Sequence, residues 1–420
     1  MRRIAVVVAA LLIVGVLAAP VAAQARPEPA ARAALAPRAI PGPAITVGLF
    51  VLDKLANLTA NETGGTGFGK FLMTLGFGDA NAAALASIQS TLNEINMKLD
   101  AIQASVNRIE AAVHAGLCKQ DQAKLSLTET AIKQAWKIIG TTVDEAKAKL
   151  NEPVAERKTG QEKLGADLIA AIKNEFRVTS LGGAVTQVHD ALVGTPGSGG
   201  QGMIQACGLA YQKKAGDFLD YRLQDEVASL VGYWQTLEAE AAVMQIGVLV
   251  NEGKRATATS ARAEAVKHLS DETAKIKPSL RDPARGDMVL DLRTHLLWRR
   301  DWLSNVAADK AGVIGATYAP AGQWKLPDIG QLRDLAKSCC GNDGSVARWF
   351  KNSTPFVLQL GVGNTQLVSG TVYPYPLAKR FFSMDIGGGY PITDYVNANA
   401  SVYAAFLNTK SAQEWQRYTY

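Results

Sequence analysis

The residues able to carry covalent or metal chemistry are few, and they are scattered along the 420-residue sequence. The four histidines, His114, His189, His268 and His295, form no HExxH motif and no pair at the spacing of metal ligands. The sequence also contains no GxSxG motif that would present a nucleophilic serine. Since no nucleophile can be placed beside a base, we expect a protein that is not an enzyme and that binds no metal or cofactor for catalysis.

One glycine-rich segment matches most of a phosphate-binding loop. Residues 64–70 read GGTGFGK, but Phe71 follows the lysine at the position where magnesium binding requires a Ser or Thr hydroxyl. No apolar strand precedes the segment, as one does in nucleotide-binding proteins. We therefore interpret the match as accidental.

Four cysteines, Cys118, Cys207, Cys339 and Cys340, are candidates for two disulfides. An even count favours disulfides in an exported chain, and four cysteines allow three pairings. Pairing within each half of the sequence would join Cys118 to Cys207 and would close a strained ring between the adjacent Cys339 and Cys340. A zinc site is the alternative, but no two cysteines have metal-binding spacing.

The N-terminus has the three parts of a cleaved export signal. Arg2 and Arg3 form a basic start, residues 4–19 are apolar and uncharged, and the segment ending at Ala25 offers the small-x-small pattern of a cleavage site. Residues 26–44 then hold five prolines among alanines, which is typical of an unfolded leader. We expect a protein secreted by the general route and cleaved near Ala25, with an uncleaved membrane anchor as the alternative.

Charge and hydropathy exclude two classes of protein. The chain carries 44 Lys and Arg against 38 Asp and Glu, and loss of Arg2 and Arg3 would lower the net charge from +6 to +4. Nucleic-acid recognition needs a dense basic face, which this balance does not supply. Because the mean hydropathy is +0.02 and only one long apolar run is present, a membrane protein with several spans is excluded as well.

Aromatic residues divide the sequence into two parts. Residues 286–420 hold 18 of the 29 aromatic residues, whereas the preceding part is rich in Ala, Leu, Ile, Lys, Glu and Gln. The C-terminal composition favours strands and a binding surface, and the earlier composition favours helices. Pro278 and Pro283 break the chain between the two. We therefore expect a helical bundle over residues 45–277, a linker over 278–286 and an α+β domain over 287–420.

The strongest helix signal runs from Leu85 to Val113. Apolar residues alternate at spacings of three and four throughout this segment, which is the heptad pattern of a long packed helix. The flanking positions lack complementary charge, so we favour one helix of an antiparallel bundle within a single chain, with oligomerisation through this seam as the alternative. Further helices are expected over about 119–150, 161–178, 203–250 and 256–277.

Two segments are unusually apolar for a soluble bundle and are candidates for membrane contact. One runs from Ile45 to Leu58 and is followed by the glycine-rich stretch 64–78, in which Phe68 to Phe77 is the candidate contact, and the other runs from Ala241 to Val250. Neither is long enough to span a bilayer as one helix. The central helix of a bundle is also apolar on all sides, so the second segment has a simpler interpretation as core. The role of the glycine-rich stretch stays open.

Three segments of the C-terminal part follow a known pattern. Residues 291–298 read DLRTHLLW, residues 324–332 read WKLPDIGQL and residues 349–354 read WFKNST. In this order they resemble the opening strand, the W-R-L-P-T-x-x-E-L segment and a later aromatic segment of the Lcl C-terminal domain family of extracellular bacterial proteins. This chain departs from the family's glycine, threonine and glutamate at three positions, where it has His295, Asp328 and Gln331.

The same residues have structural interpretations of their own. Trp298 and Trp324 are expected in the core. Asp328 is expected to cap a helix that carries Leu332 and Leu335.

The resemblance implies a C-type-lectin-like fold for residues 287–420 and the binding of a glycan or another surface partner without chemistry. It transfers no binding residue. Our own candidates for a contact surface, with a solvated turn as the alternative, are Asn342, Asp343, Tyr373, Tyr375 and Arg380. Asn and Asp offer oxygen ligands for calcium, and tyrosines can stack on sugar rings.

The function expected from the whole sequence is that of a secreted, non-enzymatic binding or adhesion protein, in which a helical bundle presents a lectin-like domain. The alternative is a pore-forming toxin, whose helical half enters a membrane after the C-terminal part has bound a target.

Overall fold

A computed structural model describes most of the chain from residue 116 onward and a few helical residues between 82 and 100. The described residues are 82–83, 85–86, 88–90, 92–97, 100, 116–195, 201–282, 286–301, 303–318, 321–340, 366–373, 380–385, 392–397, 401–404, 407–408 and 410–420. They are mostly helical with a smaller, mainly antiparallel β part, which is compatible with an α+β class. The expected export signal, the proline-rich leader and the glycine-rich stretch 64–78 lie outside the described residues.

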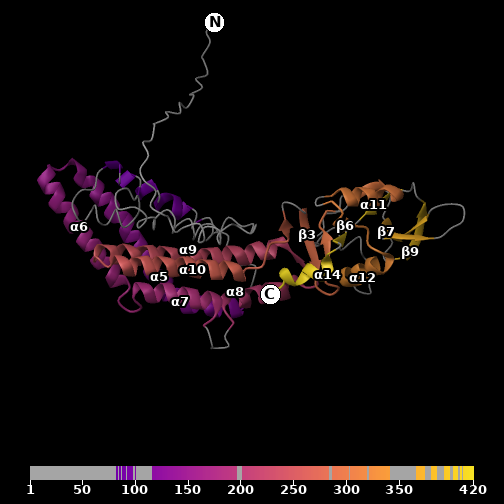
Figure 1. The fold of residues 1–420 in the computed structure, drawn as a ribbon, viewed down its shortest axis with the longest axis horizontal. Helices are drawn as coiled ribbons and strands as arrows, with labels where there is room; N and C mark the ends of the chain where they lie inside the picture. The colour runs from indigo at the N-terminus through magenta and orange to yellow at the C-terminus, as the bar shows by residue number, and fades with distance from the viewer. Residues whose placement is uncertain are drawn as a thin grey trace, which may run out of the picture. The chain divides into compact units, whose positions relative to one another are not determined.

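The helical part is built from long helices that pack around one central helix, α9 (Figure 1). The helices are α5 (Gly116–Ala148), α6 (Val154–Glu175), α7 (Leu181–Val193), α8 (Met203–Ala215), α9 (Tyr221–Asn251) and α10 (Arg255–Lys275), with a short 3-10 turn η1 (Lys149–Asn151) after α5. Helices α5, α7, α8 and α10 all contact α9. A helix surrounded in this way must be apolar on nearly all sides.

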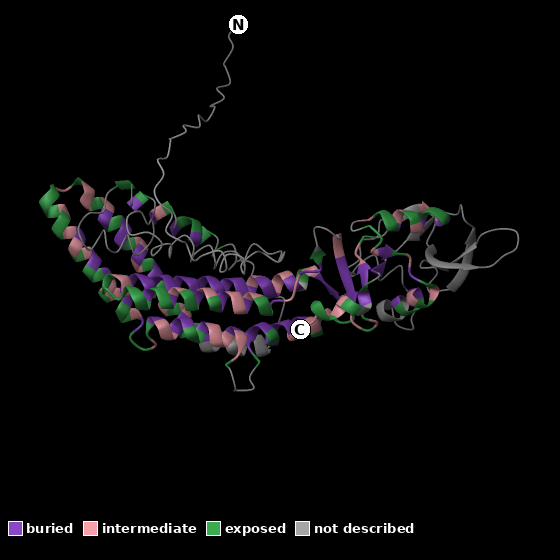
Figure 2. Cartoon of the chain, viewed as in Figure 1, coloured by how far each residue is buried: buried purple, intermediate pink, exposed green. Residues whose placement is uncertain are grey.

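The segment from Ala241 to Val250 lies in α9, where most of its side chains are buried (Figure 2). Val243, Met244 and Ile246 are fully buried in the same core cluster as residues of α5, α7 and α10. This placement agrees with the interpretation of the segment as part of the bundle core. None of the helices within the described residues combines the length and the apolarity needed to cross a bilayer.

The described part of the heptad segment packs inside the chain's own bundle. Leu85, Ile88, Leu92 and Ile95 are buried and belong to the bundle's core cluster. The Trp136 indole Nε1 on α5 donates a hydrogen bond of 3.2 Å to the Asn96 side chain, which ties the segment to the next helix. These heptad positions therefore face the same chain, as the intramolecular interpretation predicts, whereas residues 101–113 lie outside the described residues.

The expectation of one helix over residues 203–250 is wrong. Helix α8 ends at Ala215, Gly216 follows with a φ of 67°, and a short strand β1 (Phe218–Asp220) precedes α9. Glycine takes such a φ without strain, so it ends the helix. The Asp220 side chain then caps α9 by accepting a 3.0 Å hydrogen bond from the backbone N–H of Arg222. Helix α7 was also not expected.

The C-terminal part contains two sheets and short helices. The first sheet has the order β1-β3-β4-β11-β6, with β2 paired to β3, and the second has the order β5-β10-β7-β8-β9. Within the described residues the strand pairs are antiparallel, except that β10 pairs with β7 in parallel. The strands are β2 (Arg281–Asp282), β3 (Gly286–Asp291), β4 (Leu296–Arg299), β5 (Leu303–Ala307), β6 (Trp324–Lys325), β7 (Gln366–Tyr373), β8 (Arg380–Asp385), β9 (Ile392–Asn397), β10 (Ser401–Ala404) and β11 (Leu407–Asn408).

Among the described residues, short helical segments accompany these sheets: α11 (Ala308–Thr317), α12 (Ile329–Cys340), α14 (Ser411–Glu414) and η3 (Trp415–Arg417). The capping expected for α12 is confirmed. The Asp328 carboxylate accepts a 2.8 Å hydrogen bond from the backbone N–H of Gln331, and the Gln331 side chain accepts one of 2.9 Å from the backbone N–H of Asp328. This is a reciprocal capping box. Leu332 and Leu335 of the same helix are buried, as are Trp298 and Trp324, so these core expectations are confirmed too.

The junction between the two parts is packed. Strand β1, which lies between α8 and α9, pairs with β3 of the C-terminal sheet. Leu280, inside the expected linker, is fully buried and shares a core cluster with Leu219 and Tyr418. A strand pairing and a small apolar core therefore join the two parts at the predicted linker 278–286, of which residues 283–285 lie outside the described residues.

His295 adopts a backbone conformation that favours glycine. Its φ is 59°, and its ring stacks on Trp415 at 3.7 Å with an angle of 3° between the ring planes. His295→Gly removes the stacking and relaxes the backbone, whereas His295→Ala removes the stacking and keeps the strained φ. We expect the glycine variant to be more stable than the alanine variant by about 1 kcal/mol in urea unfolding.

A matched pair of variants at Lys158 tests the cause of that difference. Lys158 is exposed within α6, where the backbone is helical, so alanine there should be more stable than glycine. If glycine and alanine rank in the same order at both positions, the left-handed backbone at His295 does not govern its stability.

Candidate functional site

Two histidines and two glutamates meet inside the helical bundle. His189 lies on α7, Glu238 lies on α9, and His268 and Glu272 lie on α10. On α10 the two residues are four positions apart, so they share one face of the helix. Helices α7 and α10 both pack on α9 and on each other, which brings the three faces together. We name these four residues the His/Glu cluster.

Each histidine in the cluster is bonded to a glutamate from another helix. His189 Nδ1 lies 2.9 Å from Glu272 Oε1, and His268 Nδ1 lies 2.9 Å from Glu238 Oε1. The two imidazole rings stack on one another, with 3.8 Å between their centroids and 10° between their planes. On the other side of its ring, His268 Nε2 lies 3.8 Å from the exposed carboxylate of Glu264. The cluster therefore links α7, α9 and α10.

The glutamates lie deeper than the histidines. The side chains of Glu238 and Glu272 are fully buried, while those of His189 and His268 are 13% and 10% exposed. Burial raises the pKa of Glu238 well above its ordinary value, and repulsion from the neighbouring Glu272 carboxyl raises it further. Burial also lowers the pKa of His268, with the nearby His189 adding to the effect. The environment thus disfavours charge on both residues.

This arrangement can hold a proton or a metal ion. His189, Glu238 and His268 can each offer one ligand atom, and these atoms all lie within 4.8 Å of one another. Imidazole nitrogen and carboxylate oxygen are common metal ligands in proteins. Sequence spacing does not reveal this cluster, because His189 and Glu272 are 83 residues apart. A weak signal was present, since Glu264, His268 and Glu272 recur every fourth residue on α10.

The expected contact surface is only partly described. Tyr373 and Arg380 end β7 and begin β8, and the strand register sets them directly opposite each other. The structure therefore brings these two candidates together at one end of a strand pair. Asn342, Asp343 and Tyr375 lie outside the described residues, and so does the calcium site expected at the first two.

Of the four cysteines, Cys207 has a described side chain. It is fully buried on α8 and takes part in a disulfide. Helix α8 contacts α5, the helix that carries Cys118, so the expected partner lies on a neighbouring helix. Cys339 and Cys340 end α12, and their side chains, like that of Cys118, lie outside the described residues.

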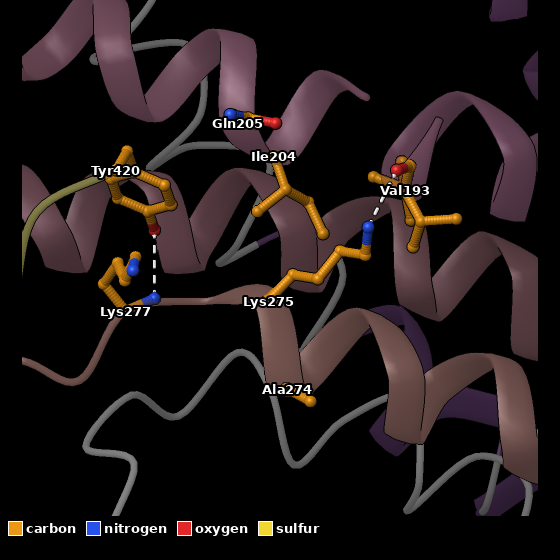
Figure 3. Close-up of a pocket in the computed structure, with 8 residues that line it drawn as sticks. Val193, Ile204, Gln205, Ala274, Lys275, Lys277 and Tyr420 are labelled. Atoms are coloured by element: carbon orange, nitrogen blue, oxygen red, sulfur yellow. Dashed lines mark hydrogen bonds between the residues drawn. The ribbon is translucent and has the colours of Figure 1, made fainter. Parts of the chain in front are cut away.

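A separate pocket lies where the last residue of the chain meets the bundle (Figure 3). Ile204 of α8 and Lys275 of α10 are among its lining residues, together with Val193 and Tyr420. Lys275 Nζ donates a 3.0 Å hydrogen bond to the Val193 carbonyl, and the Tyr420 hydroxyl accepts one of 3.3 Å from the backbone N–H of Lys277. These contacts hold the wall of the pocket together, and none of its described lining residues is an Asp, Glu or His.

Neither a family model nor a curated protein nor a solved structure matches this chain.

Proposed function

We propose that this chain is an exported, non-enzymatic binding protein, in which the C-terminal part recognises a glycan at a surface and the helical bundle carries it. The observation on which the proposal rests is the pairing of Tyr373 with Arg380 at the end of β7 and β8. A tyrosine offers a flat apolar ring with a polar tip, and an arginine offers five N–H donors. The two together suit a sugar ring that bears hydroxyl or acidic groups.

The local structure of the C-terminal part supports the proposed lectin-like fold. His295 stands where the Lcl C-terminal domain family has glycine, and its backbone still has the left-handed φ that glycine favours. Gln331 stands where that family has glutamate, and it makes the reciprocal bond of a capping box, in which either residue serves. Two of the three departures from the family pattern therefore leave the local backbone able to follow it.

The packed junction supports the role of the bundle as a carrier. The β1–β3 pairing and the buried Leu280 fix the first C-terminal sheet to the helices on either side of β1. A strand pairing of this kind attaches the C-terminal part to the bundle by more than the continuous chain.

The test is a glycan array probed with the full exported chain. We expect binding to a restricted set of glycans, and we expect Arg380→Ala and Tyr373→Ala each to reduce that binding at least tenfold. Arg177→Ala is the matched control, because Arg177 is exposed in the turn after α6, far along the chain from the strand pair. No binding to any glycan on the array would reject a glycan ligand, and binding that both variants retain would place the site elsewhere.

The pore-forming alternative gains no specific support from the described residues. The apolar segment of α9 is enclosed by neighbouring helices, and the same helix carries the fully buried carboxyls of Glu238 and Glu240. Moving this helix into a bilayer would place both carboxyls in hydrocarbon, which is costly for polar groups.

A further inference from the structure

Two buried carboxyl groups of the His/Glu cluster have oxygens that lack a donor. Glu238 and Glu272 each place Oε1 beside an imidazole, whereas the second oxygen of each, Oε2, has no hydrogen-bond partner within the described part of the chain. Both side chains are fully buried. Carboxylates removed from water need a compensating positive charge or a proton. The cluster must therefore contain a proton or a cation.

The two imidazoles favour a metal ion over a proton alone. A proton shared between two carboxyls needs no histidine, yet two histidines from different helices converge here with their rings 3.8 Å apart. Their side chains, together with that of Glu238, place three ligand atoms within 4.8 Å of one another. Helical bundles build metal sites in this way, from side chains on facing helices.

We propose that His189, Glu238 and His268 bind one divalent transition-metal ion of the zinc type, and that Glu272 holds the His189 ring by a hydrogen bond. Two nitrogens and one carboxylate oxygen form a ligand set that zinc takes in proteins. Hydrogen bonding of a ligand histidine to a carboxylate fixes the ring and strengthens it as a ligand. Calcium and magnesium prefer sets made of oxygen alone, so nitrogen ligands select against them.

Binding requires one of the rings to turn. A metal ion binds in the plane of an imidazole, whereas the planes of His189 and His268 are nearly parallel, at 10° to each other. The His189 side chain is slightly more exposed than that of His268, at 13% against 10%, so its ring lies nearer to solvent. With the ion bound, α7, α9 and α10 would be joined through one centre, and the site would stabilise the bundle.

The test uses the full chain, stripped of metal with a chelator and then supplied with Zn²⁺ alone. We expect about one zinc ion per chain after gel filtration, measured by mass spectrometry of the metal, and a higher Tm than that of the metal-free chain. Cobalt in place of zinc should give visible absorption that is typical of a metal site with a low coordination number. If the chain retains no zinc, the proposal is wrong, whatever the variants do.

Variants show whether the ion lies in the cluster. His189→Gln and His268→Gln keep a polar side chain beside the glutamates, and each should weaken zinc binding roughly 100-fold or more, by analogy with losses around known zinc sites. His295→Gln is the matched control, since His295 lies outside the bundle beside Trp415. Zinc retained equally by all three folded variants would overturn the proposal. Should the cluster variants fail to fold, an unchanged Tm of the original chain with zinc would overturn it as well.

Discussion

Replacing Glu240 by glutamine is expected to stabilise the chain strongly at alkaline pH and only slightly at acidic pH. Glu240 lies in the centre of α9, is fully buried, and has no hydrogen-bond partner for either oxygen within the described residues. Burial raises its pKa to about 8, and the positive charge of Lys133 on α5 opposes the shift only in part. The folded chain therefore holds a proton on this carboxyl at a pH where the unfolded chain has lost it.

The sign of the pH dependence follows from the two pKa values. The unfolded carboxyl loses its proton near its ordinary pKa of 4.5, and the folded one keeps it up to about pH 8. Between these values the folded chain binds more protons, so the free energy of unfolding falls as the pH rises. The glutamine side chain has no ionisable proton. The free energy of unfolding of Glu240→Gln should therefore exceed that of the original chain by about 4 kcal/mol at pH 8 and by less than about 1 kcal/mol at pH 5.

The measurement is urea unfolding of both chains at pH 5 and pH 8, with a chelator present so that no metal contributes. Glu145→Gln is the matched control, because Glu145 is exposed on α5 and should change the free energy of unfolding by less than about 0.5 kcal/mol. An equal advantage of Glu240→Gln at the two pH values would show that burial does not raise this pKa.

Local patterns in the sequence predict the parts of the fold that depend on near neighbours. The heptad spacing from Leu85 predicts buried positions, and the described ones are buried. Trp298 and Trp324 were expected in the core and are there. Asp328 was expected to cap α12, and the cap forms because donor and acceptor lie three residues apart. Each of these predictions needs only the periodicity or capping chemistry of one element.

Features that depend on distant segments were missed. Strand β1 is three residues long, and its partner β3 lies some seventy residues later, so the residues from Phe218 to Asp220 carry no strand pattern of their own. The local signals for a break, Gly216 and the capping Asp220, were nevertheless in the sequence. The strong helical periodicity on either side of them favours one continuous helix and outweighs these signals.

The His/Glu cluster was missed for the same reason. The spacing of His268 and Glu272 on α10 predicts a shared face, but an exposed face with such residues is ordinary. Only the packing of α7 and α10 on α9 shows that His189 and Glu238 complete the group and that the glutamates are buried. The sequence of α10 alone thus shows two of the four polar residues. The packing of three helices is needed to show that the four form a buried site.

Adding a single methyl group at Gly208 is expected to displace the last residue of the chain. Gly208 is buried on α8, and a Cβ atom there would overlap the ring of Tyr420. That ring packs against the bundle core, the Tyr420 backbone N–H donates a 3.0 Å hydrogen bond to Gln212, and burial raises the pKa of its hydroxyl to about 12. Gly208→Ala should therefore cost about 2 to 4 kcal/mol in the free energy of unfolding, as the loss of a largely buried aromatic ring does.

The double variant decides whether the cost arises from the ring. Tyr420→Ala alone should cost a similar amount, because the same packing is lost. With the ring already removed, Gly208→Ala should be neutral or slightly stabilising, since alanine favours a helix over glycine by up to about 1 kcal/mol. The two changes should thus be strongly non-additive in urea unfolding.

Gly140→Ala is the matched control: Gly140 lies on α5 with no atom in the way of a Cβ, so alanine there should stabilise the chain. Additive costs for the pair would mean that Tyr420 does not pack on α8, and other contacts, such as the β1–β3 pairing and the 3.1 Å hydrogen bond from Gln224 Nε2 to the Tyr418 carbonyl, would then hold the C-terminus to the bundle.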